Sequence, residues 1–177
     1  MFTKFNIKSI IVDHFSSFRH SQTKRMIVGE LVVYFSVPLV FSLVLVLGLK
    51  FFVKGTTSEV LITSLSIFSA LLFNLLLLIY DLAIKKDDLK LTDVKSKNRR
   101  TLLRETYNTI AFAIFESLIT VLILLFTYLE CPILEPVLKY VLSIISFFLV
   151  GFFLLTMLMI LKRVHSLMST DYFPKES

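Results

Sequence analysis

Four long apolar stretches, separated by short polar segments, dominate the pattern along the chain. They cover residues 31–49, 60–84, 109–129 and 137–161. A bilayer core about 30 Å thick needs roughly 20 helical residues to cross it, and each stretch is close to that length or longer. Transmembrane strands would alternate in polarity over about 10 residues, whereas these stretches are apolar on every side. The pattern therefore predicts an all-α polytopic membrane protein with four transmembrane helices.

The connecting segments predict that the four spans form two hairpins. GTTSE joins the first pair, and ECPILEP, with two prolines that end one helix and start the next, joins the second pair. Residues 85–108 form the longer central connection, a cytoplasmic loop. Because its charged part passes into LLRETYNTIAF without Gly or Pro, the third helix is expected to start near Thr101 and project into the cytoplasm. Two interpretations of this projection stand: it binds a partner, or it is an ordinary solvated, basic helix end.

Lysine and arginine are distributed unevenly between the two sides of the predicted membrane. The N-terminal tail has 5, the central loop 8 and the C-terminal tail (162–177) 3, against 3 on the opposite side, which accounts for all 19. By the positive-inside rule, both termini and the central loop are expected in the cytoplasm. The net charge of +6 therefore indicates membrane orientation, and no specific nucleic-acid binding is expected.

The N-terminal segment, residues 1–26, is not expected to act as a cleavable signal peptide, and it shows a helical apolar spacing at Ile7, Ile11, Phe15 and Phe18. This spacing favours an amphipathic helix in the membrane interface, with an irregular tail as the alternative. A group of basic residues borders the cytoplasmic side of the spans and is expected to contact anionic lipid headgroups or a partner protein. These residues are Lys24, Arg25, Lys85, Lys86, Arg99, Arg100 and Arg104.

Polar residues inside the apolar spans form two stripes at helical spacing. In the second span the stripe consists of Thr63, Ser66, Ala70, Asn74 and Asp81, and in the third span of Thr109, Ala113, Glu116, Thr120 and Thr127. Each set lies within about 60–80° on its helix. We expect the two seams to face each other, with Asn74 and Glu116 both roughly 10–15 Å from the cytoplasmic boundary. A hydrogen bond from the Asn74 amide to Glu116 is therefore predicted.

Each intramembrane polar residue has a packing and a functional interpretation. Ser, Thr and Asn commonly bond neighbouring membrane helices together, which suits Ser66, Thr120 and Asn74, while Asp81 lies at the end of its stripe. A carboxyl group inside a span, such as Glu116, lines water, carries protons or ions, or pairs internally. In a cyclic homo-oligomer built around the two seams, Glu116 would form a ring of carboxylates, which favours cations.

The residues needed for catalysis are missing from the predicted membrane domain. The three histidines lie in the tails, and no metalloprotease, serine-hydrolase or nucleotide-binding motif occurs. The single cysteine, Cys131, permits no intrachain disulfide and no cysteine metal cluster. We therefore expect neither an enzyme nor a metal or cofactor site.

The segments SLSIFSALLFNLLLLIYDLAIKK and LLRETYNTIAFAIFESLITVLILL, separated by a basic loop, give the chain a resemblance to small four-span bacterial proteins of phage defence. The layout resembles the membrane subunit of the Kiwa system and, more distantly, the phage-exclusion protein RexB. The resemblance covers about half of the chain and includes no signature motif. It implies an oligomeric inner-membrane sensor or ion-leak effector that works with a cytosolic partner.

Three functional hypotheses follow from these features. The first is an oligomeric bacterial inner-membrane sensor or channel-like effector, favoured by the paired seams, Glu116 and the basic cytoplasmic side. The second is a non-conducting adaptor that recruits a soluble protein through the 85–108 loop. The third is a small transporter that depends on Glu116 or Lys139.

Overall fold

The computed structural model describes residues 28–84, 94–128 and 136–172, and these residues are helical apart from one short connection. The elements are the helix α2 (Val28–Leu43), the π-helical turn η1 (Val44–Gly48), and the long helices α3 (Gly55–Ile84), α4 (Val94–Tyr128) and α5 (Pro136–Tyr172). No strand occurs in these ranges. The predicted all-α class is confirmed for the described part of the chain. The predicted N-terminal interfacial helix lies outside it.

Three helices are long and apolar enough to cross a membrane: Gly55–Ile84, Arg100–Tyr128 and Val137–Met168. They correspond to the second, third and fourth predicted spans. The first predicted span is a shorter apolar helix, Val32–Gly48, and it ends in the π turn. Lys50, with φ 50°, then adopts the left-handed conformation that turns the chain away from a helix end.

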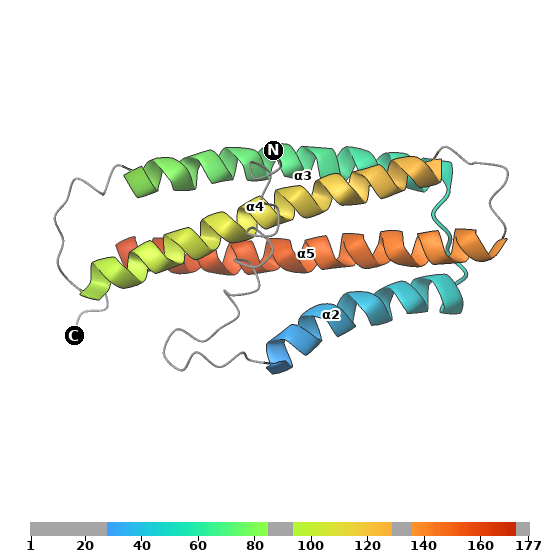
Figure 1. Cartoon of the computed structure of the whole chain (residues 1–177), viewed down its shortest axis with the longest axis horizontal. Coiled ribbons are helices and arrows are strands. Elements are labelled where there is room, and N and C mark those ends of the chain that lie inside the picture. The colour runs from blue at the N-terminus through green and yellow to red at the C-terminus, as the bar shows by residue number, and fades with distance from the viewer. Residues whose placement is uncertain (1–27, 85–93, 129–135, 173–177) are drawn as a thin grey trace, which may run out of the picture.

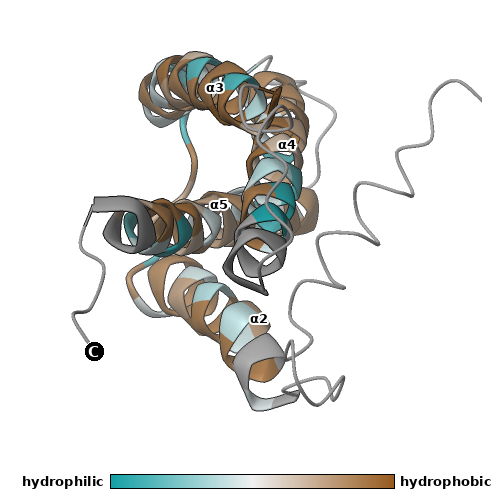
Figure 2. Cartoon of the chain, turned by 90° about the vertical axis from the view of Figure 1, so that its left-hand side faces the viewer, coloured by the Kyte–Doolittle hydropathy of each residue, from teal (hydrophilic) through white to brown (hydrophobic). Residues whose placement is uncertain are grey.

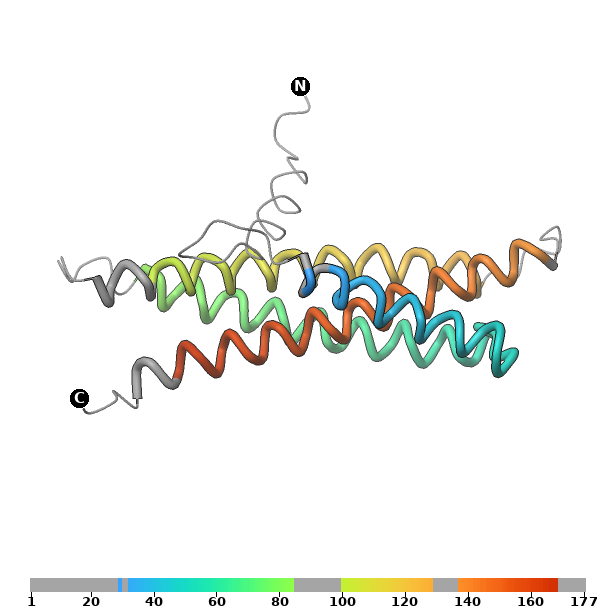
Figure 3. Tube along the Cα trace, turned by 90° about the horizontal axis from the view of Figure 1, so that it is seen from below, coloured from blue at the N-terminus to red at the C-terminus, as the bar shows by residue number. Residues whose placement is uncertain are grey.

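The helices pack side by side in the order α3, α4, α5, α2, and each runs antiparallel to its neighbour (Figures 1 and 3). The shorter α2 lies along the half of α5 that is nearer the connection between η1 and α3 (Figure 1). Viewed along the helices, apolar residues cover much of the outside of the row (Figure 2). Only 17% of the most apolar 18-residue stretch of α3 is buried among the described residues. Most of the surface of this stretch is therefore available to lipid or to another protein.

The core forms where apolar residues recur every seven positions, because that spacing returns each side chain to nearly the same face of a helix. Leu65, Leu72 and Ile79 of α3 are buried in this way and form one cluster with Ile110 and Leu124 of α4.

A second contact joins α2 to α5 at Gly151. A Cβ built there would lie 3.2 Å from the Cβ of Pro38, so the missing side chain lets the two helices approach closely.

The helix ends differ from those that the apolar stretches predict. GTTSE, expected as a turn, belongs to the first turns of α3, and the chain connects through residues 49–54 instead. The third helix begins even earlier than Thr101, at Val94, so residues 94–108 of the predicted loop are helical. The last helix continues past Leu161 to Tyr172. Apolar length marks the part of a helix that suits lipid, whereas the helix itself continues as long as backbone hydrogen bonds and packing support it.

Candidate functional site

A line of buried polar side chains runs between α4 and α5. On α4, Thr109, Glu116 and Thr120 share a face because their separations of seven and four residues are close to whole turns. On α5, Thr156 and Arg163 are also seven residues apart. Because the two helices are antiparallel, Thr109 lies beside Arg163, and Glu116 lies beside Thr156. Two short periodic patterns thus combine into one polar line.

Glu116 is the acidic residue of this line, and its side chain is only 5% exposed. Thr156 Oγ1 donates a hydrogen bond of 3.2 Å to Glu116 Oε2. The other carboxyl oxygen, Oε1, is buried and has no hydrogen-bond partner among the described residues. Thr120 Oγ1 donates to the Glu116 backbone carbonyl at 2.8 Å and not to the carboxyl group. Among the described residues, Thr156 is therefore the one donor to the carboxyl group. An ionised carboxylate normally accepts several hydrogen bonds. Glu116 Oε1 can therefore still take up a proton or contact a small cation.

Tyr34 connects α2 to the same group. Its hydroxyl is hydrogen-bonded to Thr156 Oγ1, and its ring packs edge-on against Phe152, with ring centroids 4.6 Å apart. Phe112 of α4 contacts Phe152 in turn, at 6.2 Å. The aromatic rings exclude water from one side of the polar contacts, where low polarity strengthens each hydrogen bond and raises the cost of an unpaired group. The Thr156 hydroxyl of α5 therefore links the Glu116 carboxyl group of α4 to the Tyr34 hydroxyl of α2.

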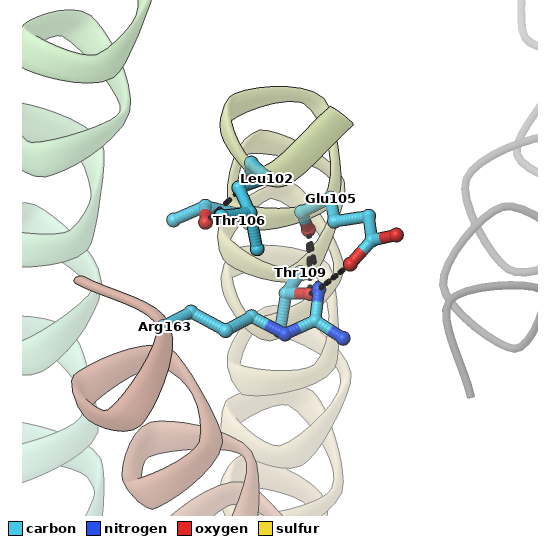
Figure 4. A network of polar contacts seen from close by, with 5 residues as sticks. All are labelled: Leu102, Glu105, Thr106, Thr109 and Arg163. Carbon is cyan, nitrogen blue, oxygen red and sulfur yellow. Dashed lines mark hydrogen bonds and ion pairs between the residues drawn. The ribbon is translucent and has the colours of Figure 1, made fainter. Parts of the chain in front are cut away.

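Arg163 forms a second polar contact nearer the predicted cytoplasmic end (Figure 4). Its Nη1 donates to the Glu105 carbonyl at 2.9 Å and to Thr109 Oγ1 at 2.8 Å. The Glu105 carboxylate lies 3.9 Å from the same nitrogen, and both side chains are partly exposed, so the ion pair contributes little beyond the hydrogen bonds. Arg163 thus joins the C-terminal part of α5 to the N-terminal part of α4, at Glu105 and Thr109.

Glu116 and Thr120 occupy the buried face that their spacing predicts, but that face meets α5 and not α3. Thr109 and Ala113 of the same stripe are buried with them, and Thr127 is half-buried. The expectation that the two polar seams face each other is wrong. Two hydrogen bonds instead join α3 and α4 directly: one between the hydroxyls of Ser69 and Ser117, and one from the Tyr128 hydroxyl to Glu59 Oε1 at 3.2 Å.

The predicted polar residues of α3 lie on its exposed side. Ser66, Asn74 and Asp81 are all exposed, and Ser66 Oγ donates to the Ile62 carbonyl of its own helix at 2.8 Å. The predicted hydrogen bond between Asn74 and Glu116 is therefore wrong. Periodicity identifies the residues that share a face of one helix, but it carries no information about which neighbour that face contacts.

Several residues of the site escaped the sequence interpretation. Tyr34 and Thr156 are isolated polar residues in apolar stretches, and Arg163 appears at the sequence level only as a tail residue. The seven-residue separation of Thr156 and Arg163, equal to that of Thr109 and Glu116, is the signal that could have indicated an antiparallel polar pairing.

The predicted membrane-surface residues are only partly described. Arg100 and Arg104 are exposed near the start of α4, at the same end of the molecule as Arg163. Lys24, Arg25, Lys85 and Lys86, and the side chain of Arg99, lie outside the described residues. Among the residues that the structure does describe, no group of three or more His, Cys, Asp and Glu side chains is arranged to hold a metal ion.

The fold and the site define a class: an all-helical protein with three apolar helices suited to multiple membrane crossings and a buried polar line between two of them. No protein-family model matches the chain, and neither a curated protein nor a solved structure matches it.

Proposed function

We propose that this chain is a four-span, homo-oligomeric protein of the bacterial inner membrane, with both termini in the cytoplasm, which acts as a sensor or channel-like effector. Three long apolar helices support multiple crossings. The fourth crossing is supported by the apolar helix Val32–Gly48, which runs antiparallel to α5. At its N-terminal end this helix extends back to Val28. The excess of Lys and Arg at one side supports the orientation.

The observation that carries the proposal is the half-satisfied Glu116 carboxyl group, buried where α2, α4 and α5 meet. A proton or cation taken up at Oε1 changes the charge beside Thr156, and Thr156 also bonds Tyr34 of α2. Such a change alters the packing of three helices, which is the local event that a membrane switch requires. Because Glu116 is buried within one protomer, the proposed path for protons or cations past Glu116 runs between α4 and α5. This path replaces the ring of Glu116 carboxylates between copies that the sequence suggested.

Ion leakage through the cell membrane tests this proposal. Expression of the wild-type chain is expected to depolarise cells, and Glu116→Gln, which removes the ionisable group and keeps its size, is expected to reduce the leakage about tenfold, a change of about 1.4 kcal/mol. Asp81→Asn, the same chemical change on the exposed side of α3, is the matched control and should leak like the wild type. Leakage that is absent both before and during phage infection, or equal in the Glu116→Gln variant, would exclude the channel.

The anti-phage setting is supported by the resemblance in layout alone. In that setting, the trigger acts during infection, and a cytosolic companion works with the membrane protein. The same leakage measurement, repeated before and during phage infection, tests it: leakage that depends on infection supports a sensor, whereas constant leakage supports an ungated pore.

A second candidate is a membrane adaptor that recruits a cytosolic protein, and the helical extension of α4 favours it. Residues 94–108 form a helix that Arg163 ties to α5, with Arg100 and Arg104 exposed on it. A rigid basic helix offers a defined surface to an acidic partner. Replacing both arginines by serine should abolish co-purification of a cytosolic protein, whereas Lys54→Ser, at the other end of the molecule, should not. Unchanged co-purification would exclude this surface.

A further inference from the structure

The polar stripe of α3 faces away from the other helices that the structure describes. Its residues are exposed, namely Thr63, Ser66, Ala70, Asn74 and Asp81. The buried residues of α3, namely Ser58, Leu65, Leu72 and Ile79, lie about 160° away around the helix. No described element covers the stripe. These positions of an apolar helix are thus directed away from the other described helices, unlike Ser58 and Ser69, which face the protein.

Asn74 makes this arrangement costly for a single protomer. It lies ten residues before the end of α3 at Ile84, which is roughly 15 Å inside the helix and within the hydrocarbon region. Its side-chain amide has two donor hydrogens and an acceptor oxygen, and it makes no hydrogen bond to a described residue. Lipid chains offer none. Ser66, by contrast, is satisfied by its own backbone. The Asn74 amide therefore favours a polar partner at its own depth.

A second copy of the chain meets this need. All copies insert with the same orientation, so two α3 helices that meet are parallel, and equal residues lie at equal depth. An asparagine amide is complementary to itself, because each can donate to the other's oxygen. Ala70 and Ser66, about one and two turns from Asn74, are small and let two helix backbones approach closely. A lipid headgroup cannot reach this depth.

We propose that two copies of this chain pair through the α3 stripe, with the Asn74 amides hydrogen-bonded across a two-fold axis normal to the membrane. The pairing rests on the proposed homo-oligomer and assigns its contact face. The helices cross near Ser66 and Ala70 and diverge toward the cytoplasmic end, which separates the two Asp81 carboxylates. The face is distinct from the Glu116 site, which lies on the far side of α4.

Disulfide cross-linking in native membranes tests the pairing. In a Cys131→Ser background, a single cysteine replaces either Ala70 on the α3 stripe or Leu118 on the exposed side of α4. Leu118 is the matched control because antiparallel packing places it at nearly the same depth, as the contact between Ser69 and Ser117 indicates. Mild oxidation should produce covalent dimers of the Ala70→Cys chain at least about tenfold faster than of the Leu118→Cys chain. Equal rates would overturn the proposal.

A second variant tests the role of the amide. Adding Asn74→Leu to the Ala70→Cys chain should slow dimer formation about five- to tenfold, since two hydrogen bonds are lost, whereas Asn74→Gln should restore most of the rate. Asn74 is exposed, so neither change disturbs the protomer core. A rate that Asn74→Leu leaves unchanged, or cross-links to a different protein only, would overturn the assignment.

The same variants separate this inference from the proposed function. Dimers through Ala70→Cys in a chain that does not leak support the interface while the channel fails. Leakage that persists while cross-links form only through Leu118→Cys overturns the interface and leaves the proposed function standing.

Discussion

Thr156 is the residue on which the buried polar line depends. Its single hydroxyl proton has two acceptors within reach, Glu116 Oε2 at 3.2 Å and the Phe152 carbonyl at 3.0 Å. The Tyr34 hydroxyl also bonds to Thr156 Oγ1. When Tyr34 donates to Thr156, the Thr156 proton is free to serve Glu116. One small side chain thus determines whether the acid has any donor.

Thr156→Val, which keeps the shape and removes the hydroxyl, is expected to destabilise the protein by about 1–3 kcal/mol, because Glu116 and Tyr34 each lose a buried hydrogen bond. Reversible unfolding in detergent measures the loss. Thr63→Val is the control: Thr63 is exposed on α3, and its change should stay within about 0.5 kcal/mol. Equal effects of the two substitutions would show that the Thr156 contacts contribute nothing specific.

At this scale the sequence predicted part of the site. The spacing of Thr109, Glu116 and Thr120 correctly indicated one shared face, because helical periodicity is a local property. The partner of that face was predicted wrongly, since Asn74 and Thr156 are both polar residues in apolar helices, and only the order of packing distinguishes them.

Among the helices, the contact of α2 with α5 depends on an absent side chain. A Cβ at Gly151 would come within 3.2 Å of the Pro38 Cβ and 3.5 Å of its Cα. The second of these atoms belongs to the backbone, so relief requires movement of α2 as a whole. The same movement would separate Tyr34 from Thr156, about one turn further along α5.

Gly151→Val should therefore lower stability by about 1–3 kcal/mol, equivalent to a fall of roughly 3–10 °C in the melting temperature. Circular dichroism in detergent follows the transition. Gly29→Val provides the comparison, since a Cβ at Gly29 meets nothing within 4 Å. A melting temperature that Gly151→Val does not lower would mean that α2 is not packed as closely as described.

For the molecule as a whole, the ends of the described helices gather at two opposite ends. Residues 49–54, the C-terminal end of α4 and the start of α5 lie at one end, and the C-terminal ends of α3 and α5 and the start of α4 lie at the other (Figure 1). The basic Arg100, Arg104 and Lys162 belong to the second end, which the positive-inside rule assigns to the cytoplasm.

Labelling of single cysteines with a membrane-impermeant maleimide checks the orientation. In the Cys131→Ser background, Lys54→Cys should react in intact spheroplasts, whereas Arg104→Cys should react only after lysis, because the two exposed positions lie at opposite ends. The reverse pattern would place the basic end outside and contradict the proposed topology.

The sequence by itself determined the helical class, the three long apolar helices and the polar face of α4, because apolar length and helical period depend only on neighbouring residues. The tertiary structure alone decided that Glu116 meets Thr156 and Tyr34, that Asn74 points outward and that α4 begins at Val94. These outcomes depend on which helices lie side by side, and in a chain whose helices are apolar on nearly every side, composition leaves that order open. It is settled by a few close contacts, such as Gly151 against Pro38 and Arg163 against Thr109.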